Sequence, residues 1–180
     1  MAQIRIRNTS ERIHDQSKVK AFLDRQDVIF EKWEMSQLSP ALREKFSLTD
    51  DEKSQILTTF DREIKDLASR RGYEIWDVIS LSDATPHIEE LLKKFEQVHT
   101  HTEDEIRAIV GGQGIFVIKG KDDIGYFDIE LEAGDVISVP EHTNHFFTLM
   151  DQRQIVAVRL FIEKDGWIAH NVEDSEFVQA

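Results

Sequence analysis

The sequence contains no cysteine, so it has neither a disulfide framework nor thiolate chemistry, and a reducing compartment is the natural one for it. It also lacks a long apolar run, and its first residues show none of the apolar character of a signal peptide. We therefore expect a soluble cytoplasmic protein without a membrane partner.

Positive charge is scarce as well. Only 22 Lys and Arg residues stand against 35 Asp and Glu residues, which gives a formal net charge of -13. A chain with this charge repels nucleic acids and anionic membranes. Hydrophobic residues make up 40% of the sequence, which excludes general disorder and allows a sizeable core. We expect one domain over residues 1–180 and no nucleic-acid partner.

Residues 1–98 combine helical and extended patterns. Apolar residues at helical spacing predict helices over residues 17–25, 50–71 and 86–95. Thr49 and Glu52 fit a capping box at the start of the second helix, and Gly72 fits its end. Thr85 is the expected N-cap of the third helix. Strands are predicted over residues 28–35 and 73–81.

From about residue 98 the sequence changes to short apolar runs separated by turns, with no helical period between them. The successive runs EIRAIV, GGQG and IFVIKG predict a β-hairpin with its turn at the glycines. Closely spaced strands of this kind indicate an antiparallel sandwich or barrel. The first half of the chain is expected to pack around that barrel.

The stretch VHTHTEDEIRAIV brings together side chains that suit a metal ion. Alternate side chains of a strand share one face, so His99, His101 and Glu105 are expected to point the same way. Imidazole nitrogens with one carboxylate suit a divalent transition metal, and open positions beside such a set are typical of non-haem Fe(II) oxygen chemistry. His145, after a turn that begins at Pro140, is a candidate fourth ligand. The competing interpretation is a buried polar cluster without an ion.

These blocks resemble the two motifs of the cupin superfamily. The longer runs HTHTEDEIRAIVGGQGIFVI, GDVISVPEHTNHFF and VAVRLFIEKDGWIAHNV resemble the acireductone dioxygenase family of the methionine salvage pathway. QDVIFEKWEM, ILTTFDREI and RRGYEIWDVISLSD extend the resemblance over nearly the whole chain. It implies a mainly β fold with added helices. The expected core is a cupin-type antiparallel β-barrel, or jelly roll, over residues 99–170, with an N-terminal α/β elaboration over residues 1–98 and a tail over residues 171–180.

The resemblance also implies an activity, the oxidation of the acireductone 1,2-dihydroxy-3-keto-5-methylthiopentene by O2. It assigns the ligands of one Fe(2+) per chain, or of Ni(2+) or Co(2+) in the same site, to His99, His101, Glu105 and His145. With iron, the family yields formate and 4-methylthio-2-oxobutanoate, the keto acid precursor of methionine. With nickel or cobalt, it yields carbon monoxide, formate and 3-methylthiopropanoate. We expect a monomer whose metal keeps two positions open for the substrate.

Two arginines are candidates for substrate binding. Arg107 lies two residues after Glu105, so its guanidinium should enter the same cavity and stabilise an anionic substrate there. The alternative is an exposed strand arginine paired with Glu103 or Asp104. Arg159 is expected to support the site from behind.

Aromatic residues form the second group of candidates. Phe95, Phe147 and Trp167 resemble the pocket aromatics of the family and would hold the methylthio tail. They fit an ordinary core equally well, because aromatic side chains dominate protein cores. Phe116, Phe127 and Phe161 are assigned to the core.

Two positions depart from the family pattern. Ala108 stands where the family usually has an aromatic residue, which would widen the pocket or alter its packing. His142 stands where cupins commonly have glycine, so a residue with a Cβ is expected in a tight turn.

Other functions of the same fold stay open. One is a different cupin enzyme, either another metal-dependent oxygenase or a sugar-phosphate isomerase, which should carry more basic residues around its pocket. The other is a non-catalytic cupin that binds a metal or a small ligand, because one fold supports many activities.

Overall fold

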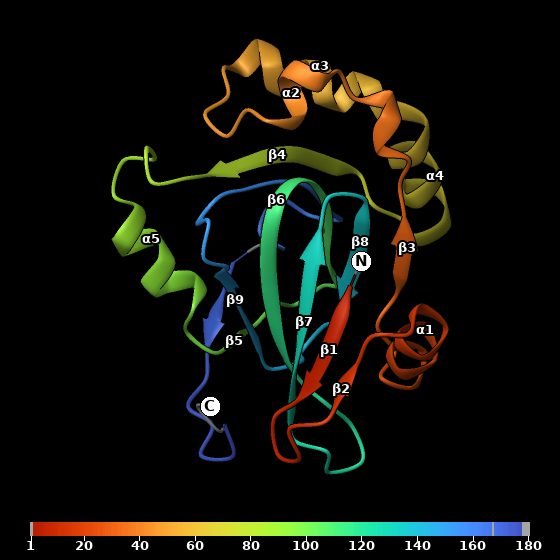
Figure 1. Cartoon of the computed structure of the whole chain (residues 1–180), viewed down its shortest axis with the longest axis vertical. Helices are drawn as coiled ribbons and strands as arrows, with labels where there is room; N and C mark the ends of the chain where they lie inside the picture. The colour runs from red at the N-terminus through yellow and green to blue at the C-terminus, as the bar shows by residue number, and fades with distance from the viewer. Residues whose placement is uncertain (1, 167, 178–180) are drawn as a thin grey trace.

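The fold is described by a computed structural model for residues 2–166 and 168–177. It is mostly antiparallel β-sheet with helices at its flanks, which confirms the predicted mainly β class (Figure 1). The strands are β1 Gln3–Ile6, β2 Arg12–Ile13, β3 Phe30–Lys32, β4 Ile75–Leu81, β5 His99–Thr100, β6 Glu105–Lys119, β7 Tyr126–Glu132, β8 Asp135–Val139, β9 His145–Leu149, β10 Ile155–Phe161 and β11 His170–Asn171. The helices are α1 Gln16–Arg25, η1 Met35–Gln37, α2 Pro40–Arg43, α3 Asp50–Thr59, α4 Asp61–Arg71 and α5 Ile88–Phe95. Within the described residues, no helix has the length and apolar character needed to span a membrane.

Strand β6 connects the two halves of the sheet. Its first part pairs with β8 and β10, and its second part pairs with β7 and β9, all antiparallel. Figure 1 shows β6 as a strongly curved ribbon between these partners. The predicted hairpin over this stretch is therefore wrong, because the glycines bend a single strand of 15 residues instead of turning the chain back.

The bend requires glycine for steric reasons. Gly112 has a φ of 71°, and the register between β6 and β10 shifts beside it, between Val156 and Ala157. A Cβ at position 112 would collide with the carbonyl oxygen of Gln154. Glycine-rich stretches mark bulges and bends within strands as well as turns between them, so the sequence pattern alone did not distinguish the two.

We expect Gly112→Ala to destabilise the protein by more than about 2 kcal/mol, because left-handed backbone strain and a backbone clash coincide there. Gly72→Ala is a matched control. Gly72 is also left-handed, with a φ of 80°, but a Cβ there meets nothing within 4 Å, so only about 1 kcal/mol of strain is expected. Urea unfolding measures both variants, and equal losses would contradict the role given to the bend.

The first half of the chain follows several of its sequence signals. The capping box forms, with Glu52 N donating to Thr49 Oγ1 at 3.2 Å and Thr49 N donating to Glu52 Oε1 at 2.9 Å. Gly72 ends α4 in the left-handed conformation. The single helix predicted over residues 50–71 is instead two helices that meet at Phe60. This break leaves the Phe60 ring fully buried and stacked on Trp33, with centroids 5.0 Å apart.

Two other element boundaries differ from the prediction. Helix α5 begins at Ile88 after a left-handed His87, so Thr85 is not its N-cap. The Thr85 hydroxyl instead accepts a hydrogen bond from Ser82 N at 3.0 Å and closes a local turn. The strand predicted over residues 28–35 shortens to β3, which pairs with β8, and the chain enters η1 directly afterwards.

Two cores lie on opposite faces of the first part of β6. Ile106, Ala108 and Val110 pack with residues of α3, of α4 and of the junction between them, such as Ile56, Ile64 and Phe60. Ile109 belongs to the other core, and Glu105 and Arg107 share its face of the strand. Ala108 therefore affects packing against the helices and does not widen the cavity on the other face. This alternation directs Glu105 and Arg107 to the candidate site.

Candidate active site

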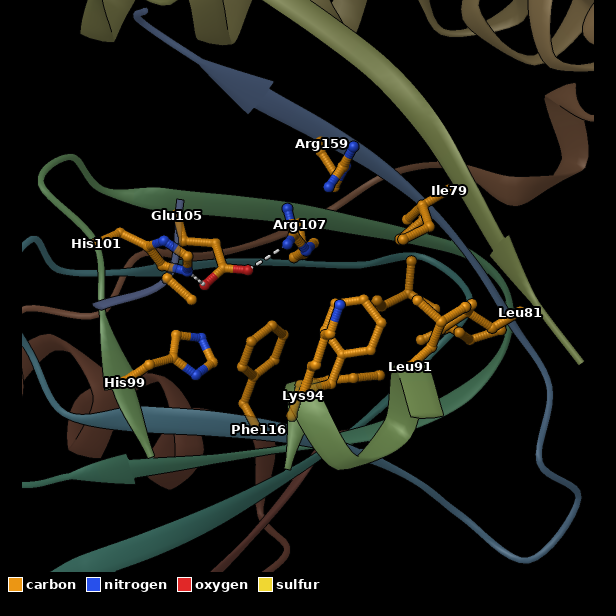
Figure 2. Close-up of a pocket in the computed structure, with 16 residues that line it drawn as sticks. Ile79, Leu81, Leu91, Lys94, His99, His101, Glu105, Arg107, Phe116 and Arg159 are labelled. Atoms are coloured by element: carbon orange, nitrogen blue, oxygen red, sulfur yellow. Dashed lines mark ion pairs between the residues drawn. The ribbon is translucent and has the colours of Figure 1, made fainter. Parts of the chain in front are cut away.

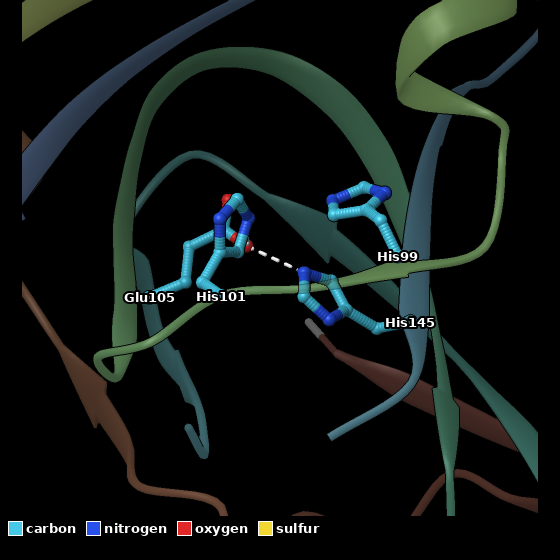
Figure 3. Close-up of side chains that lie close together, drawn as sticks. All are labelled: His99, His101, Glu105 and His145. Atoms are coloured by element: carbon cyan, nitrogen blue, oxygen red, sulfur yellow. Dashed lines mark hydrogen bonds and ion pairs between the residues drawn. The ribbon is translucent and has the colours of Figure 1, made fainter. Parts of the chain in front are cut away.

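Three histidines and one glutamate converge on one point (Figure 3). His99 comes from β5, His101 from the segment that follows it, Glu105 from the start of β6 and His145 from β9. His99 and His145 are direct partners in the pairing of β5 with β9. All four side chains are buried, and their potential ligand atoms lie within 4.8 Å of one another. The structure thus brings together the four predicted ligands and forms a site that can bind a metal ion.

A backbone carbonyl fixes the ring of each histidine. Because a carbonyl oxygen only accepts, Nδ1 carries the proton of each neutral ring, which directs the lone pair of Nε2 toward a metal ion. Such partners on the far side of the ring are the usual support of metal-binding histidines. The Nδ1 atoms of His99, His101 and His145 lie 2.6, 3.0 and 2.8 Å from the carbonyl oxygens of Gln97, Ile168 and Thr143.

Two of the Nε2 atoms face a carboxylate. Oε2 of Glu105 lies 2.6 Å from Nε2 of His145 and 3.1 Å from Nε2 of His101. Two acceptor lone pairs at this distance need a shared proton or a cation between them. A donor set of imidazole nitrogens and one carboxylate oxygen fits a divalent transition ion. The residues present therefore fit the implied metal.

Burial and charge set the protonation states of the site. Burial, with a contribution from His145, lowers the pKa of His99 to about 4. Burial opposes ionisation of Glu105, but the Arg107 charge and the histidine hydrogen bonds hold its pKa well below the ordinary value. Burial would also lower the pKa of His101, but the hydrogen bond to Glu105 raises it overall. Near neutral pH, His99 is neutral and Glu105 is ionised, as metal binding requires.

Acidification is expected to release a divalent ion, because protons compete with it for the histidines. The pKa of His101 is raised above its ordinary value. As the pH falls, protons should therefore begin to compete with the metal ion at this ligand earlier than they would at an ordinary histidine. His99 adds competition only as the pH approaches about 4. Metal content after dialysis over a pH series measures this effect. Full retention at about pH 4.5, well below the ordinary histidine pKa, would contradict three histidine ligands.

A cavity of about 280 Å³ opens beside these side chains (Figure 2). His99, His101 and Glu105 line one end, and aliphatic side chains line the other. Such a combination of a few convergent polar groups and apolar walls is typical of small-molecule sites. The aliphatic and aromatic lining residues are Ile79, Leu81, Leu91, Phe95, Ile109, Phe116, Phe147, Ile155, Ala157 and Ala169.

Arg107 enters this cavity as predicted. One arm of its guanidinium, Nη2, forms an ion pair with Oε1 of Glu105, and its side chain is 12% exposed. Its Nη1 is buried and has no hydrogen-bond partner within the described parts of the chain. Burial lowers the pKa of Arg107 to about 10, so the group is still a cation at neutral pH. The alternative pairing with Glu103 or Asp104 does not occur, because Glu103 instead accepts from backbone N–H groups of residues 162 and 163.

Arg159 lines the same cavity from the adjacent strand. It is the register partner of Arg107 in the pairing of β10 with β6. Asp77 on β4 holds its guanidinium by two hydrogen bonds of 2.8 and 2.6 Å. Asp77 was not among the predicted site residues, although a single charged residue in the run IWDVISL was a usable signal. The pair fixes Arg159 at the cavity wall.

The predicted aromatics have different outcomes. Phe95 and Phe147 line the cavity and contact edge to face, with centroids 6.5 Å apart. Phe116 is a buried core residue as expected, and it also lines the cavity, 5.1 Å from the Phe147 ring. Phe127 and Phe161 are buried core residues as expected. Trp167 lies outside the described residues.

The turn before β9 contains the second departure from the family pattern. His142 has a φ of 58°, so a residue other than glycine does occupy a left-handed position there. Its N–H donates to the carbonyl oxygen of His101 at 2.9 Å. Asp104 accepts from Glu141 N at 3.0 Å and forms an ion pair with Arg71. Asp104 therefore holds this turn in place and does not contact a ligand ring.

Comparison with known proteins gives one consistent result. The ARD/ARD' family matches residues 3–169. The chain is 59% identical over 180 residues to acireductone dioxygenase of Geobacillus thermodenitrificans, with 100% of both chains covered. It is 60% identical over 176 residues to that of Geobacillus kaustophilus, with 98% of both covered.

A solved structure supports the same relationship. Acireductone dioxygenase from Bacillus anthracis with cadmium ion in active center superposes with a TM-score of 0.91 at 53% identity. The match covers 94% of this chain and 97% of that chain. It confirms the predicted cupin-type fold.

Proposed function

The chain belongs to the acireductone dioxygenase family, and on that premise we propose that it oxidises 1,2-dihydroxy-3-keto-5-methylthiopentene with O2 in methionine salvage. The Fe(2+) form would yield 4-methylthio-2-oxobutanoate and formate. The Ni(2+) or Co(2+) form would yield 3-methylthiopropanoate, carbon monoxide and formate. One observation carries the proposal: three buried imidazoles and a buried carboxylate bring their possible ligand atoms within 4.8 Å of one another, at one end of a cavity whose other end is apolar.

His99, His101, Glu105 and His145 would hold one divalent ion. When bound, the ion supplies Lewis acidity toward the enediol oxygens of the substrate and access to O2 chemistry. The protein prepares the ligands in advance. Carbonyl groups orient each imidazole, and the Arg107 charge keeps Glu105 ionised. Little reorganisation is then needed when the ion binds.

Arg107 would bind the reacting end of the substrate. Its Nη1 is a buried donor without a protein partner among the described residues, and an anionic oxygen in the cavity would satisfy it. Its other arm is held by Glu105, which fixes the direction of the guanidinium. Arg159, held by Asp77, would place a second cation on the same wall. Fixed charges in a site with little water stabilise developing negative charge effectively.

The apolar end would receive the methylthio tail. Phe95 and Phe147 present their rings there, and Leu91 and Ile79 contribute aliphatic surface. Thioether sulfur packs favourably against aromatic rings, and burial of the tail away from water adds to binding. A pocket role for Trp167 is part of the proposal on the basis of sequence resemblance alone. The monomeric state and the cytoplasmic location belong to it in the same way, and the lack of cysteine suits a reducing compartment.

Oxygen uptake tests this function. The protein is stripped of metal, reloaded with Fe(2+) and given the acireductone in an oxygen electrode. We expect uptake of O2 that depends on both the metal and the substrate. Tight binding of the acireductone without uptake would contradict the proposal and favour a non-catalytic cupin. Turnover of a sugar phosphate would favour the isomerase instead.

A further inference from the structure

The cavity is positively charged although the chain as a whole is strongly acidic. Its formal net charge is -13, so an anion that approaches the protein is repelled over most of the surface. Three cations line the cavity, namely Arg107, Arg159 and Lys94, whereas Glu105 is the one acid that lines it among the described residues. A cavity with this balance favours an anionic ligand.

Lys94 is the one exposed cation among the three that line the cavity. It lies in the last turn of α5, three residues after Leu91, so the two side chains share a face of the helix. Its side chain is exposed, and Figure 2 shows it extending from α5 into the cavity toward the wall that carries Arg107. Lys94 is therefore in contact with both solvent and the cavity.

Lys94 also differs from the two arginines in its partners. Arg107 forms an ion pair with Glu105, and Arg159 forms one with Asp77. Lys94 has no ion pair with any carboxylate of the described residues. Glu90, four residues earlier on the same helix, is the acid spaced to pair with Lys94, but its contact is with Nδ1 of His87, 3.9 Å away. The charge of Lys94 is therefore available to a ligand.

We propose that Lys94 is a substrate-binding residue whose ammonium attracts the anionic acireductone to the cavity and contacts it there. This inference rests on the proposed function. A ketone conjugated with an enediol is a vinylogous acid, so the substrate carries negative charge near neutral pH. Attraction by Lys94 offsets the repulsion by the acidic surface and favours ionised ligands over neutral ligands of the same shape.

The simpler interpretation is that Lys94 only complements the C-terminal end of the α5 dipole. A comparison with Lys93 distinguishes this interpretation from a role in substrate binding. It is the same residue type in the same helical turn, but it does not line the cavity. Lys93→Met and Lys94→Met remove the same charge from the same end of the helix, and of the two residues only Lys94 lines the cavity. Lys94→Arg retains the cation.

Anaerobic binding of the acireductone to the Ni(2+)-loaded protein measures the effect without turnover. At low ionic strength we expect Lys94→Met to weaken binding about tenfold and Lys93→Met less than about twofold, with Lys94→Arg close to the unmodified protein. Added salt should weaken binding by the unmodified protein more than by Lys94→Met. Equal affinities of the Lys94→Met and Lys93→Met proteins would overturn the role of Lys94.

Oxygen uptake by the same proteins keeps this result separate from the proposed function. Suppose that the unmodified protein consumes O2 with the acireductone while Lys94→Met binds it as tightly as Lys93→Met. This result would support the proposed dioxygenase activity and contradict the role of Lys94. Suppose instead that none of the proteins consumes O2 but Lys94→Met still binds the acireductone more weakly than Lys93→Met. This result would contradict the proposed dioxygenase activity and support the role of Lys94.

Discussion

His145→Gln is expected to lose metal affinity by more than about 100-fold, and oxygen uptake with it. Loss of second-sphere partners alone costs about 10- to 100-fold at typical sites, and this change removes a ligand itself. Glutamine retains most of the volume, so the buried site should not collapse. His145 is 1% exposed, and its Nε2 lies 2.6 Å from the Glu105 carboxylate, where the ion would bind. Metal per chain is measured after dialysis against a competing chelator.

The matched control is His170→Gln. His170 lies in β11, which pairs with β5 beside His99, but its side chain is exposed and not part of the four-residue group. This variant should hold one ion per chain as tightly as the unmodified protein. Unchanged metal affinity in His145→Gln would remove His145 from the ligand set.

Arg107→Met is expected to keep its metal and to lose about 10²- to 10³-fold in turnover, the effect typical of removing one donor that stabilises developing negative charge. The buried Nη1 of Arg107 is the free donor nearest to the Glu105 end of the cavity among the described residues. Because Glu105 also loses a buried cation partner in this variant, the metal-loaded form is compared. Steady-state oxygen uptake gives kcat and KM, and metal analysis gives the occupancy.

Arg71→Met is the matched control for Arg107. Arg71 pairs with Asp104 and does not line the cavity. The control loses an arginine from an ion pair near the same strand, so general effects on stability are represented in it. Its turnover should stay within about twofold of the unmodified protein, as expected for a partly exposed pair. Equal turnover by Arg107→Met and the control would contradict the role of Arg107.

The metal ligands could be predicted because their residue types are restrictive. Few side chains bind transition metals, and a group such as His99, His101, Glu105 and His145 at cupin spacing is typical of a metal site. The orientation of the histidine rings was harder to predict from the sequence. His101 lies outside a strand, and its ring is held by the carbonyl of Ile168, 67 residues later. Partners so far apart in the sequence depend on the tertiary fold.

The bend of β6 and the strands that form the cavity wall could not be predicted from the local sequence pattern. GGQG fits a turn and a bend equally well, and the clash with Gln154, next to β10, that decides between them is a long-range contact. Strands β1 and β4 of the first half pair with β7 and β10 of the second, so this half extends the sheets as well as covering them. The assignment of one domain to residues 1–180 stays a prediction.

Phe116 and Lys94 were missed for different reasons. Phe116 lies beyond the bend of β6, so the face that its side chain occupies could not be counted from Glu105. Lys94 follows the apolar stripe of α5 at helical spacing, but the stripe alone predicts burial and not a cavity beside it. The tertiary arrangement turned both into cavity residues.

The most direct test of the central claim is product analysis after separate reloading of metal-free protein with Fe(2+) and Ni(2+), followed by reaction with the acireductone and O2. The account predicts formate and 4-methylthio-2-oxobutanoate from the iron form, and carbon monoxide, formate and 3-methylthiopropanoate from the nickel form. Absence of these oxidation products from both loaded forms, with one ion bound per chain, would contradict it.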